Sequence, residues 1–236
     1  MGGRGRKEIL LYVPNLIGYA RLVLLGAGIA FFQSHPPTFL GLYLLQMSLD
    51  MVDGYLARLL SQESRVGAVL DVVADNGART MMYMCAVANA PFSPLSSPPF
   101  LLAYLSTATG IIVLEWITFA SSHGSSLATG VHWKVARSGS PQVPWLLRTM
   151  FANGFKNPLG AWVILSIAGL PMAMYVATLP WDWIPPLLFL AVAGTLVLGR
   201  VLGIMAETYV ISQHIHLLLD LDLNDDLPTP DHEHHE

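Results

Sequence analysis

Residues 50–75 read DMVDGYLARLLSQESRVGAVLDVVAD, and their four aspartates stand within two otherwise apolar segments. Asp50 and Asp53 are three residues apart, and Asp71 and Asp75 are four apart, so each pair projects from one face of a helix. Because only a short polar connection separates the segments, we expect two antiparallel helices whose carboxylates converge. Charged groups are costly in hydrocarbon, so the pattern predicts a polar site inside the membrane.

Four converging carboxylates repel one another unless cations bind among them. Hard oxygen ligands at this density favour magnesium or manganese, and shared carboxylates favour two ions. Gly54, Ala57 and Gly67 lack the bulk that would keep the helices, or a bound phosphate, away from the metals. Arg58 follows the first acidic pair, where its planar guanidinium can reach a phosphate oxygen. Simple neutralisation of the acids by nearby arginines does not explain why four acids enter apolar helices.

The composition of the whole chain is that of a membrane protein. Of its 236 residues, 53% are hydrophobic and only 12% are charged, whereas a soluble domain has about 25% charged residues. A net charge of −4 without a long basic run argues against a nucleic acid as partner. The single cysteine, Cys85, excludes a disulfide scaffold and is interpreted as a small buried apolar residue.

Six apolar segments are long enough to cross about 30 Å of hydrocarbon at about 1.5 Å per residue. They fall at about 12–32, 38–60, 66–92, 99–121, 157–179 and 184–210. The sequence therefore predicts an all-α integral membrane protein with six transmembrane helices. We expect residues 1–211 to form the membrane catalytic domain with a juxtamembrane N-terminus, and the acidic, His-rich residues 212–236 to form a disordered cytosolic tail.

The lysines and arginines predict the orientation, because they accumulate in short cytoplasmic loops. Nine cations fall on one face of the predicted bundle, and the loops of the other face hold none. These nine are Arg4, Arg6, Lys7, Arg58, Arg65, Lys134, Arg137, Arg148 and Lys156. The bias predicts that both termini are cytosolic. The remaining cations, Arg21, Arg79 and Arg200, lie within predicted spans and point to a polar site.

The motif residues resemble the signature of the CDP-alcohol phosphatidyltransferase family. The pattern reads Asp50-x-x-Asp53-Gly54-x-x-Ala57-Arg58, eight residues, then Gly67-x-x-x-Asp71-x-x-x-Asp75. The segment YVPNLIGYAR at 12–21 is similar to that of the eukaryotic, inositol-using members of the family. The resemblance implies the six-helix fold of the family. It also implies an enzyme that transfers the phosphatidyl group from CDP-diacylglycerol to myo-inositol and releases CMP.

The resemblance also implies roles for individual residues. The ligands of one or two Mg²⁺ or Mn²⁺ ions are Asp50, Asp53, Asp71 and Asp75, and Asp75 is also the general base. The residues that contact CDP-diacylglycerol are Asn15, Gly54, Ala57, Arg58 and Gly67. Asn15 also fits a second interpretation, as part of a Pro-Asn pair that starts a helix. Members of the family are commonly homodimers of the endoplasmic reticulum, with the active site facing the cytosol.

The acceptor site departs from the pattern of the family. Inositol-using members carry arginine directly after the last motif aspartate, and this chain has Asn76 there. Arg79, one turn later, replaces that cation, or the acceptor is another alcohol. Lys134 and Arg137 are further candidates for the acceptor site, although basic loop residues also arise from topology alone.

Two functions from other classes remain open. The chain could keep the fold but be catalytically impaired, as a regulatory or scaffold membrane paralogue, and the change at Asn76 leaves room for this. It could also be a carrier of divalent cations or of anions. The four intact aspartates favour an enzyme, and Gly54, Ala57 and Arg58 in register with them favour a phosphate-bearing substrate.

Overall fold

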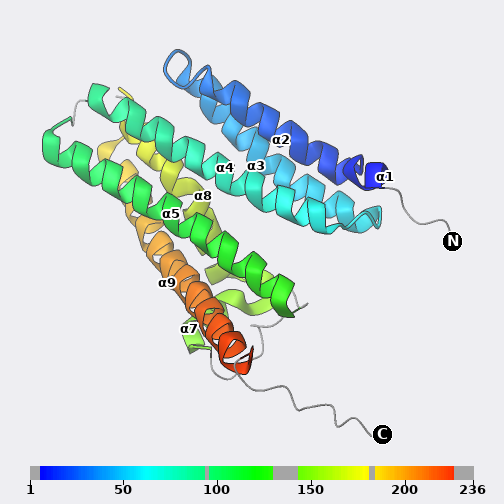
Figure 1. Ribbon diagram of the computed structural model, residues 1–236. Helices are drawn as coiled ribbons and strands as arrows, with labels where there is room; N and C mark the ends of the chain where they lie inside the picture. The colour runs from blue at the N-terminus through cyan, green and yellow to red at the C-terminus, as the bar shows by residue number, and fades with distance from the viewer. Residues whose placement is uncertain (1–5, 94–95, 130–142, 181–183, 226–236) are drawn as a thin grey trace, which may run out of the picture. The chain divides into compact units, whose positions relative to one another are not determined.

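The part of the chain that the structure describes is helical, apart from short turns (Figure 1). A computed structural model describes residues 6–93, 96–129, 143–180 and 184–225. Its helices are α1 (Arg6–Leu10), α2 (Val13–Ile29), α3 (Pro36–Leu59), α4 (Arg65–Asn89), α5 (Pro98–Thr129), α7 (Trp145–Phe151), α8 (Pro158–Ala177) and α9 (Pro186–Asp225), with 3₁₀ turns η1 (Ala90–Phe92) and η2 (Ala152–Phe155). The six long helices coincide with the six predicted apolar segments, so the all-α prediction is confirmed.

The predicted count of six membrane spans is supported for three helices of the described ranges. By length and composition, the segments able to cross a membrane are Pro98–Ser125, Pro158–Ala177 and Pro186–Leu223. Helix α2 is apolar but has only 17 residues, a length of about 26 Å. Helices α3 and α4 carry the charged residues of the motif, which make them more polar than an ordinary span. The count of six spans therefore stays a prediction.

The chain divides into two compact units. The first comprises Met1–Val113 and Leu165–Leu198, and the second comprises Leu114–Ile164 and Gly199–Glu236. The acidic motif lies entirely in the first unit.

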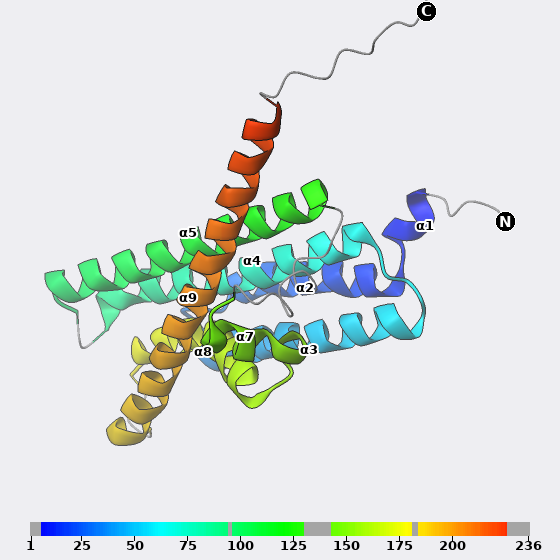
Figure 2. The ribbon, with the colours of Figure 1, turned by 90° about the horizontal axis from the view of Figure 1, so that it is seen from below.

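Helix α2 packs along both α3 and α4 in the first unit (Figure 1), and the three helices stay together when seen from below (Figure 2). Ser64 caps the start of helix α4, and its Oγ accepts a hydrogen bond from the backbone N–H of Gly67 at 2.9 Å. Two glycines allow α2 to approach α4 closely. A Cβ on Gly18 would lie 2.6 Å from Leu70 Cδ2, and one on Gly67 would lie 2.7 Å from Asn15 Oδ1.

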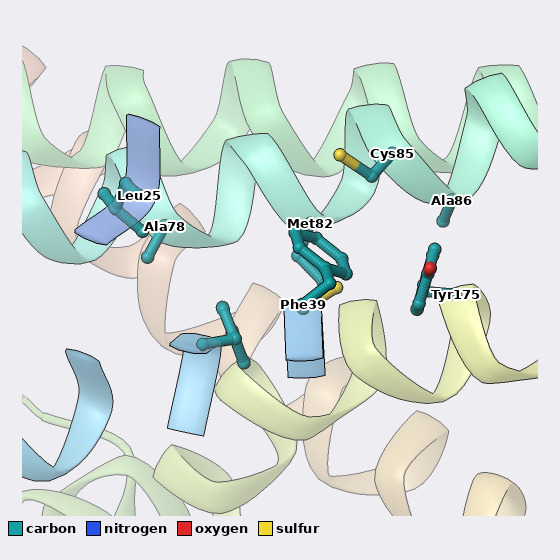
Figure 3. Close-up of a cluster of buried hydrophobic side chains, with 8 residues drawn as sticks. Leu25, Phe39, Ala78, Met82, Cys85, Ala86 and Tyr175 are labelled. Atoms are coloured by element: carbon teal, nitrogen blue, oxygen red, sulfur yellow. The ribbon is translucent and has the colours of Figure 1, made fainter. Parts of the chain in front are cut away.

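An apolar core fixes these three helices against one another (Figure 3). Its buried members are Leu25, Phe39, Tyr43, Ala78, Met82, Cys85, Ala86 and Tyr175. The rings of Phe39 and Tyr175 meet edge to face with centroids 4.9 Å apart, an arrangement that aromatic pairs favour. Cys85 lies among these side chains, which confirms its interpretation as a small buried apolar residue. The helices that carry the acidic motif are therefore held by a packed core.

Helix α9 continues past residue 211 to Asp225. Helical structure thus extends into the segment that we expected to be a disordered tail. Residues 217–223 read LLLDLDL, and leucine is among the strongest helix formers, which explains the continuation. The domain boundary at residue 211 stays a prediction, and residues 226–236 lie outside the described part of the chain.

Candidate functional site

The four motif aspartates gather between α3 and α4. One carboxylate oxygen from each of Asp50, Asp53 and Asp71 lies within 4.8 Å of the other two. Asp75 lies one turn after Asp71 on α4, and both carboxylates contact the same arginine, Arg21. The Asp53 side chain is 9% exposed, whereas the side chains of the other three are between 36% and 46% exposed. The cluster is therefore closed around Asp53 and accessible at its other three members.

A fully buried arginine from α2 stands at the centre of the aspartates. Arg21 Nη1 lies 3.0 Å from Asp50 Oδ1 and 2.9 Å from Asp53 Oδ2. The same nitrogen lies 2.9 Å from Asp71 Oδ1, and Arg21 Nη2 contacts Asp75 Oδ1. The arginine itself has no exposed side-chain surface. One guanidinium group thus links α2, α3 and α4.

A neutral residue holds the other side of this guanidinium. Gln46 on α3 is buried, and its Oε1 accepts a hydrogen bond from Arg21 Nε at 3.0 Å. If all four aspartates are ionised, Arg21 and Arg79, which lies 3.8 Å from Asp75, leave two negative charges of the cluster unbalanced. Hard carboxylate oxygens that already surround a cationic group form a donor set that fits magnesium or manganese. The residues present therefore fit the metal site that the family resemblance implies.

Sequence analysis flagged Arg21 as an intramembrane charge but gave it no partner. The available signal was its position in an apolar helix close in sequence to a four-acid motif. Arg200, flagged in the same way, lies in the second unit and pairs there with Glu115 and Glu207. Only one of these two arginines therefore belongs to the acidic cluster.

Three of the five residues proposed to meet the nucleotide side lie along α3. Arg58 is exposed, whereas Gly54 and Ala57 are half-buried. A Cβ on Gly54 would lie 3.8 Å from Arg58 Nη1 and 3.9 Å from Nη2, so the guanidinium folds back over the glycine. This leaves a positive group beside a backbone surface with little side-chain bulk, which suits an anionic ligand.

Asn15 and Gly67 are engaged in packing. Asn15 is buried, and its Nδ2 donates a hydrogen bond to the carbonyl oxygen of Ile9 at 2.6 Å. Gly67 lies next to Asn15 Oδ1, and a Cβ on Gly67 would lie only 2.7 Å from that oxygen. Both residues thus seat the start of α2 against the start of α4.

The acceptor-side candidates are described in part. Arg79 Nη1 lies 3.8 Å from Asp75 Oδ2, and Arg79 Nη2 donates a hydrogen bond to Asn76 Oδ1. Asn76 therefore accepts a hydrogen bond from the arginine that lies beside Asp75. Lys134 and Arg137 lie outside the described residues.

Comparison with known proteins identifies a family over most of the chain. The family model described as CDP-alcohol phosphatidyltransferase matches residues 11–184. This range includes the acidic motif, Arg21 and Arg79. No solved structure matches the chain.

Several curated relatives carry the same name, CDP-diacylglycerol–inositol 3-phosphatidyltransferase. The protein from Rattus norvegicus is 35% identical over 137 residues, which cover 57% of this chain and 59% of the relative. A protein from Arabidopsis thaliana, numbered 1, is 31% identical over 146 residues, covering 62% of this chain and 58% of the relative. The Homo sapiens protein is 42% identical over 83 residues, covering 35% and 37%. The chain spans three fifths or less of the length of these relatives.

Proposed function

The chain belongs to the CDP-alcohol phosphatidyltransferase family, and from this premise we propose that it transfers the phosphatidyl group of CDP-diacylglycerol to myo-inositol. The alcohol oxygen forms a bond to the phosphorus that carries diacylglycerol, and CMP leaves with the electron pair of the broken phosphorus–oxygen bond. The observation that carries the proposal is the gathering of Asp50, Asp53, Asp71 and Asp75 around one point, in a chain whose relatives are named for transfer to inositol.

The four aspartates hold one or two Mg²⁺ or Mn²⁺ ions in this proposal. Bound there, the metal would neutralise the diphosphate, polarise the phosphorus under attack and stabilise the charge of departing CMP. Arg58, exposed beside Gly54 and Ala57, binds a phosphate oxygen of the nucleotide lipid. Asn15 and Gly67 support this nucleotide side by seating α2 on α4.

Asp75 takes the proton from the attacking hydroxyl. Its side chain is 36% exposed, so a water-soluble polyol can approach it, and a carboxylate in hydrogen-bond reach of a hydroxyl is a suitable general base. Arg79 stands beside it as a hydrogen-bond donor that orients the acceptor. We include Lys134 and Arg137 as further acceptor-side residues on the sequence pattern alone.

The membrane setting completes the proposal. Six spans with both termini and the active site on the cytosolic side, in the endoplasmic reticulum, agree with the one-sided distribution of cations in the sequence. A homodimer is the assembly that the family suggests. In a Cys85→Ala background, Glu63→Cys should label only from the cytosol and Ser34→Cys only from the opposite side, and the reverse result would overturn this topology.

An acceptor panel tests the reaction. The full chain in nanodiscs is supplied with CDP-diacylglycerol, Mg²⁺ or Mn²⁺, and labelled inositol, serine or glycerol 3-phosphate, and both CMP and labelled lipid are scored. We expect CMP and labelled lipid with inositol, and neither with the Asp53→Ala variant. Labelled lipid with another alcohol alone would reassign the acceptor, an outcome that Asn76 makes worth testing. No product with any alcohol would favour a catalytically impaired paralogue.

A further inference from the structure

The geometry around Arg21 carries an inference about how the acidic site is filled. Nη1 of Arg21 has three carboxylate oxygens at 2.9–3.0 Å, from Asp50, Asp53 and Asp71. These are the same three residues whose oxygens lie close enough together to hold a metal ion. A positive nitrogen of the chain itself therefore occupies the point on which the three carboxylates converge.

A guanidinium nitrogen and a metal ion cannot share that point. Mg²⁺ requires oxygen ligands at about 2.0–2.1 Å, so it would sit at the centre of the oxygens that now surround Nη1. A guanidinium held there as well would place two positive charges in direct contact in a poorly solvated site. The Arg21 side chain has no exposed surface, so water cannot solvate its positive charge unless the side chain moves.

The guanidinium has one hydrogen-bond partner that is not a carboxylate. Arg21 Nε is bonded to Gln46 Oε1, a neutral buried acceptor about one turn before Asp50 on α3. This contact therefore holds the arginine to α3 independently of the carboxylates.

We propose that Arg21 is the resident counter-cation of the acidic site, and that its Nη1 must leave the point shared by Asp50, Asp53 and Asp71 before a divalent ion binds there. This rests on the metal site of the proposed function. Metal loading is then an exchange of one cation for another. Arg21 stabilises the gathered aspartates and, by the same contacts, weakens their affinity for the metal.

A supporting role for Arg21 predicts the opposite change in metal affinity. If Arg21 keeps its place while the metal is bound and only orients the carboxylates, its removal would disorder the ligands and weaken metal binding. The sign of the change in affinity therefore distinguishes competition from support.

The test uses Mn²⁺ as the probe and the full chain in nanodiscs. Free Mn²⁺ is measured by electron paramagnetic resonance, and the Tm is recorded with and without Mn²⁺. Arg21→Met, which removes the charge and the donors but keeps most of the length, should bind Mn²⁺ at least about tenfold more tightly. Its Tm without Mn²⁺ should fall, and saturating Mn²⁺ should raise that Tm more than it raises the Tm of the unsubstituted chain.

Arg200→Met is the matched control, because Arg200 is also a buried, ion-paired arginine but contacts glutamates of the second unit. It should lower the Tm and leave the Mn²⁺ affinity unchanged. If Arg21→Met does not fold, Arg21→Gln carries the same comparison, since its neutral amide can still donate to an aspartate.

The outcomes separate this inference from the function on which it rests. Unchanged or weaker Mn²⁺ binding in the Arg21 variants, with binding intact in the unsubstituted chain, overturns the counter-cation role and leaves the metal site standing. Binding by neither the unsubstituted chain nor the Arg21 variants overturns the metal site itself. Binding that appears or tightens only when Arg21 is removed, and disappears again with Asp53→Asn, supports the exchange.

Discussion

Two buried arginines of this chain have contrasting surroundings. Arg21 in the first unit meets four aspartates, three of which are between 36% and 46% exposed. Arg200 in the second unit meets two glutamates, Glu115 at 3.3 Å and Glu207 at 2.9 Å, whose side chains are 2% and 12% exposed. Three carboxylates of the first cluster are accessible, whereas both carboxylates of the second are nearly enclosed.

This difference teaches how a site differs from a structural ion pair. A buried arginine needs carboxylates in either setting, because an unpaired buried charge is costly. Both clusters have more acids than arginines, however, and only at the first does exposure allow a ligand to reach the carboxylates. We therefore expect chemistry at the Arg21 cluster and only stability at the Arg200 cluster.

Removing an acid at the first cluster should have the largest effect. Asp50→Ala, Asp53→Ala or Asp71→Ala should each abolish phosphatidyl transfer while the chain remains in the membrane, because each removes a ligand oxygen from the convergence point. A chelator should do the same and excess Mg²⁺ or Mn²⁺ should reverse it, as measured by CMP release. Full activity in excess chelator would contradict the metal-dependent assignment.

A smaller loss of activity is expected from a substitution that keeps the shape of the Asp75 side chain and removes only its ability to accept a proton. Asp75→Asn preserves the side-chain volume but cannot accept a proton, so turnover should fall by at least about 100-fold. Binding of CDP-diacylglycerol, measured separately, should persist. Near-normal turnover in this variant would assign the base to another residue.

Arg79→Ala tests the second arginine of the first cluster, the one beside Asp75. If Arg79 orients the acceptor beside Asp75, the KM for inositol should rise by about tenfold or more with little change in affinity for CDP-diacylglycerol. If affinity for the nucleotide lipid falls equally, Arg79 serves only to neutralise Asp75.

The smallest effect on catalysis is expected at the second cluster. Arg200→Met removes a cation that Glu115 and Glu207 contact, and breaking a buried pair typically costs about 3–5 kcal/mol of stability. The Tm should fall, whereas transfer activity measured well below that Tm should stay close to that of the unsubstituted chain. A collapse of activity in the folded variant would show that both arginines serve the reaction.

Much of the first unit was predictable from local pattern. Apolar runs predicted the six long helices, and the spacing of Asp50, Asp53, Asp71 and Asp75 predicted their convergence, because helix geometry fixes which residues share a face. The number of spans was less predictable. Length and hydropathy alone do not separate an apolar helix such as α8 from α3 and α4, which carry the motif. The charged residues of each helix must be counted as well.

The contacts of Arg21 were not predictable from the sequence, because they depend on how α2 rotates and packs. Sequence analysis flagged Arg21 and Arg200 alike, since both are charges in apolar segments, and only tertiary packing separates them. The sequence predicts that Asn15 and Gly67 bind the substrate. It does not predict that they pack against each other, because that contact depends on the close approach of α2 to α4.

The three-helix junction at Arg21 has a consequence for biosynthesis. The four aspartates that contact Arg21 follow it by 29 to 54 residues, so none of them has left the ribosome when Arg21 emerges. A buried arginine without a carboxylate partner is costly. Helix α2 therefore gains the partners that neutralise its arginine only when α3 and α4 pack against it, and we expect the three helices to reach their final arrangement together.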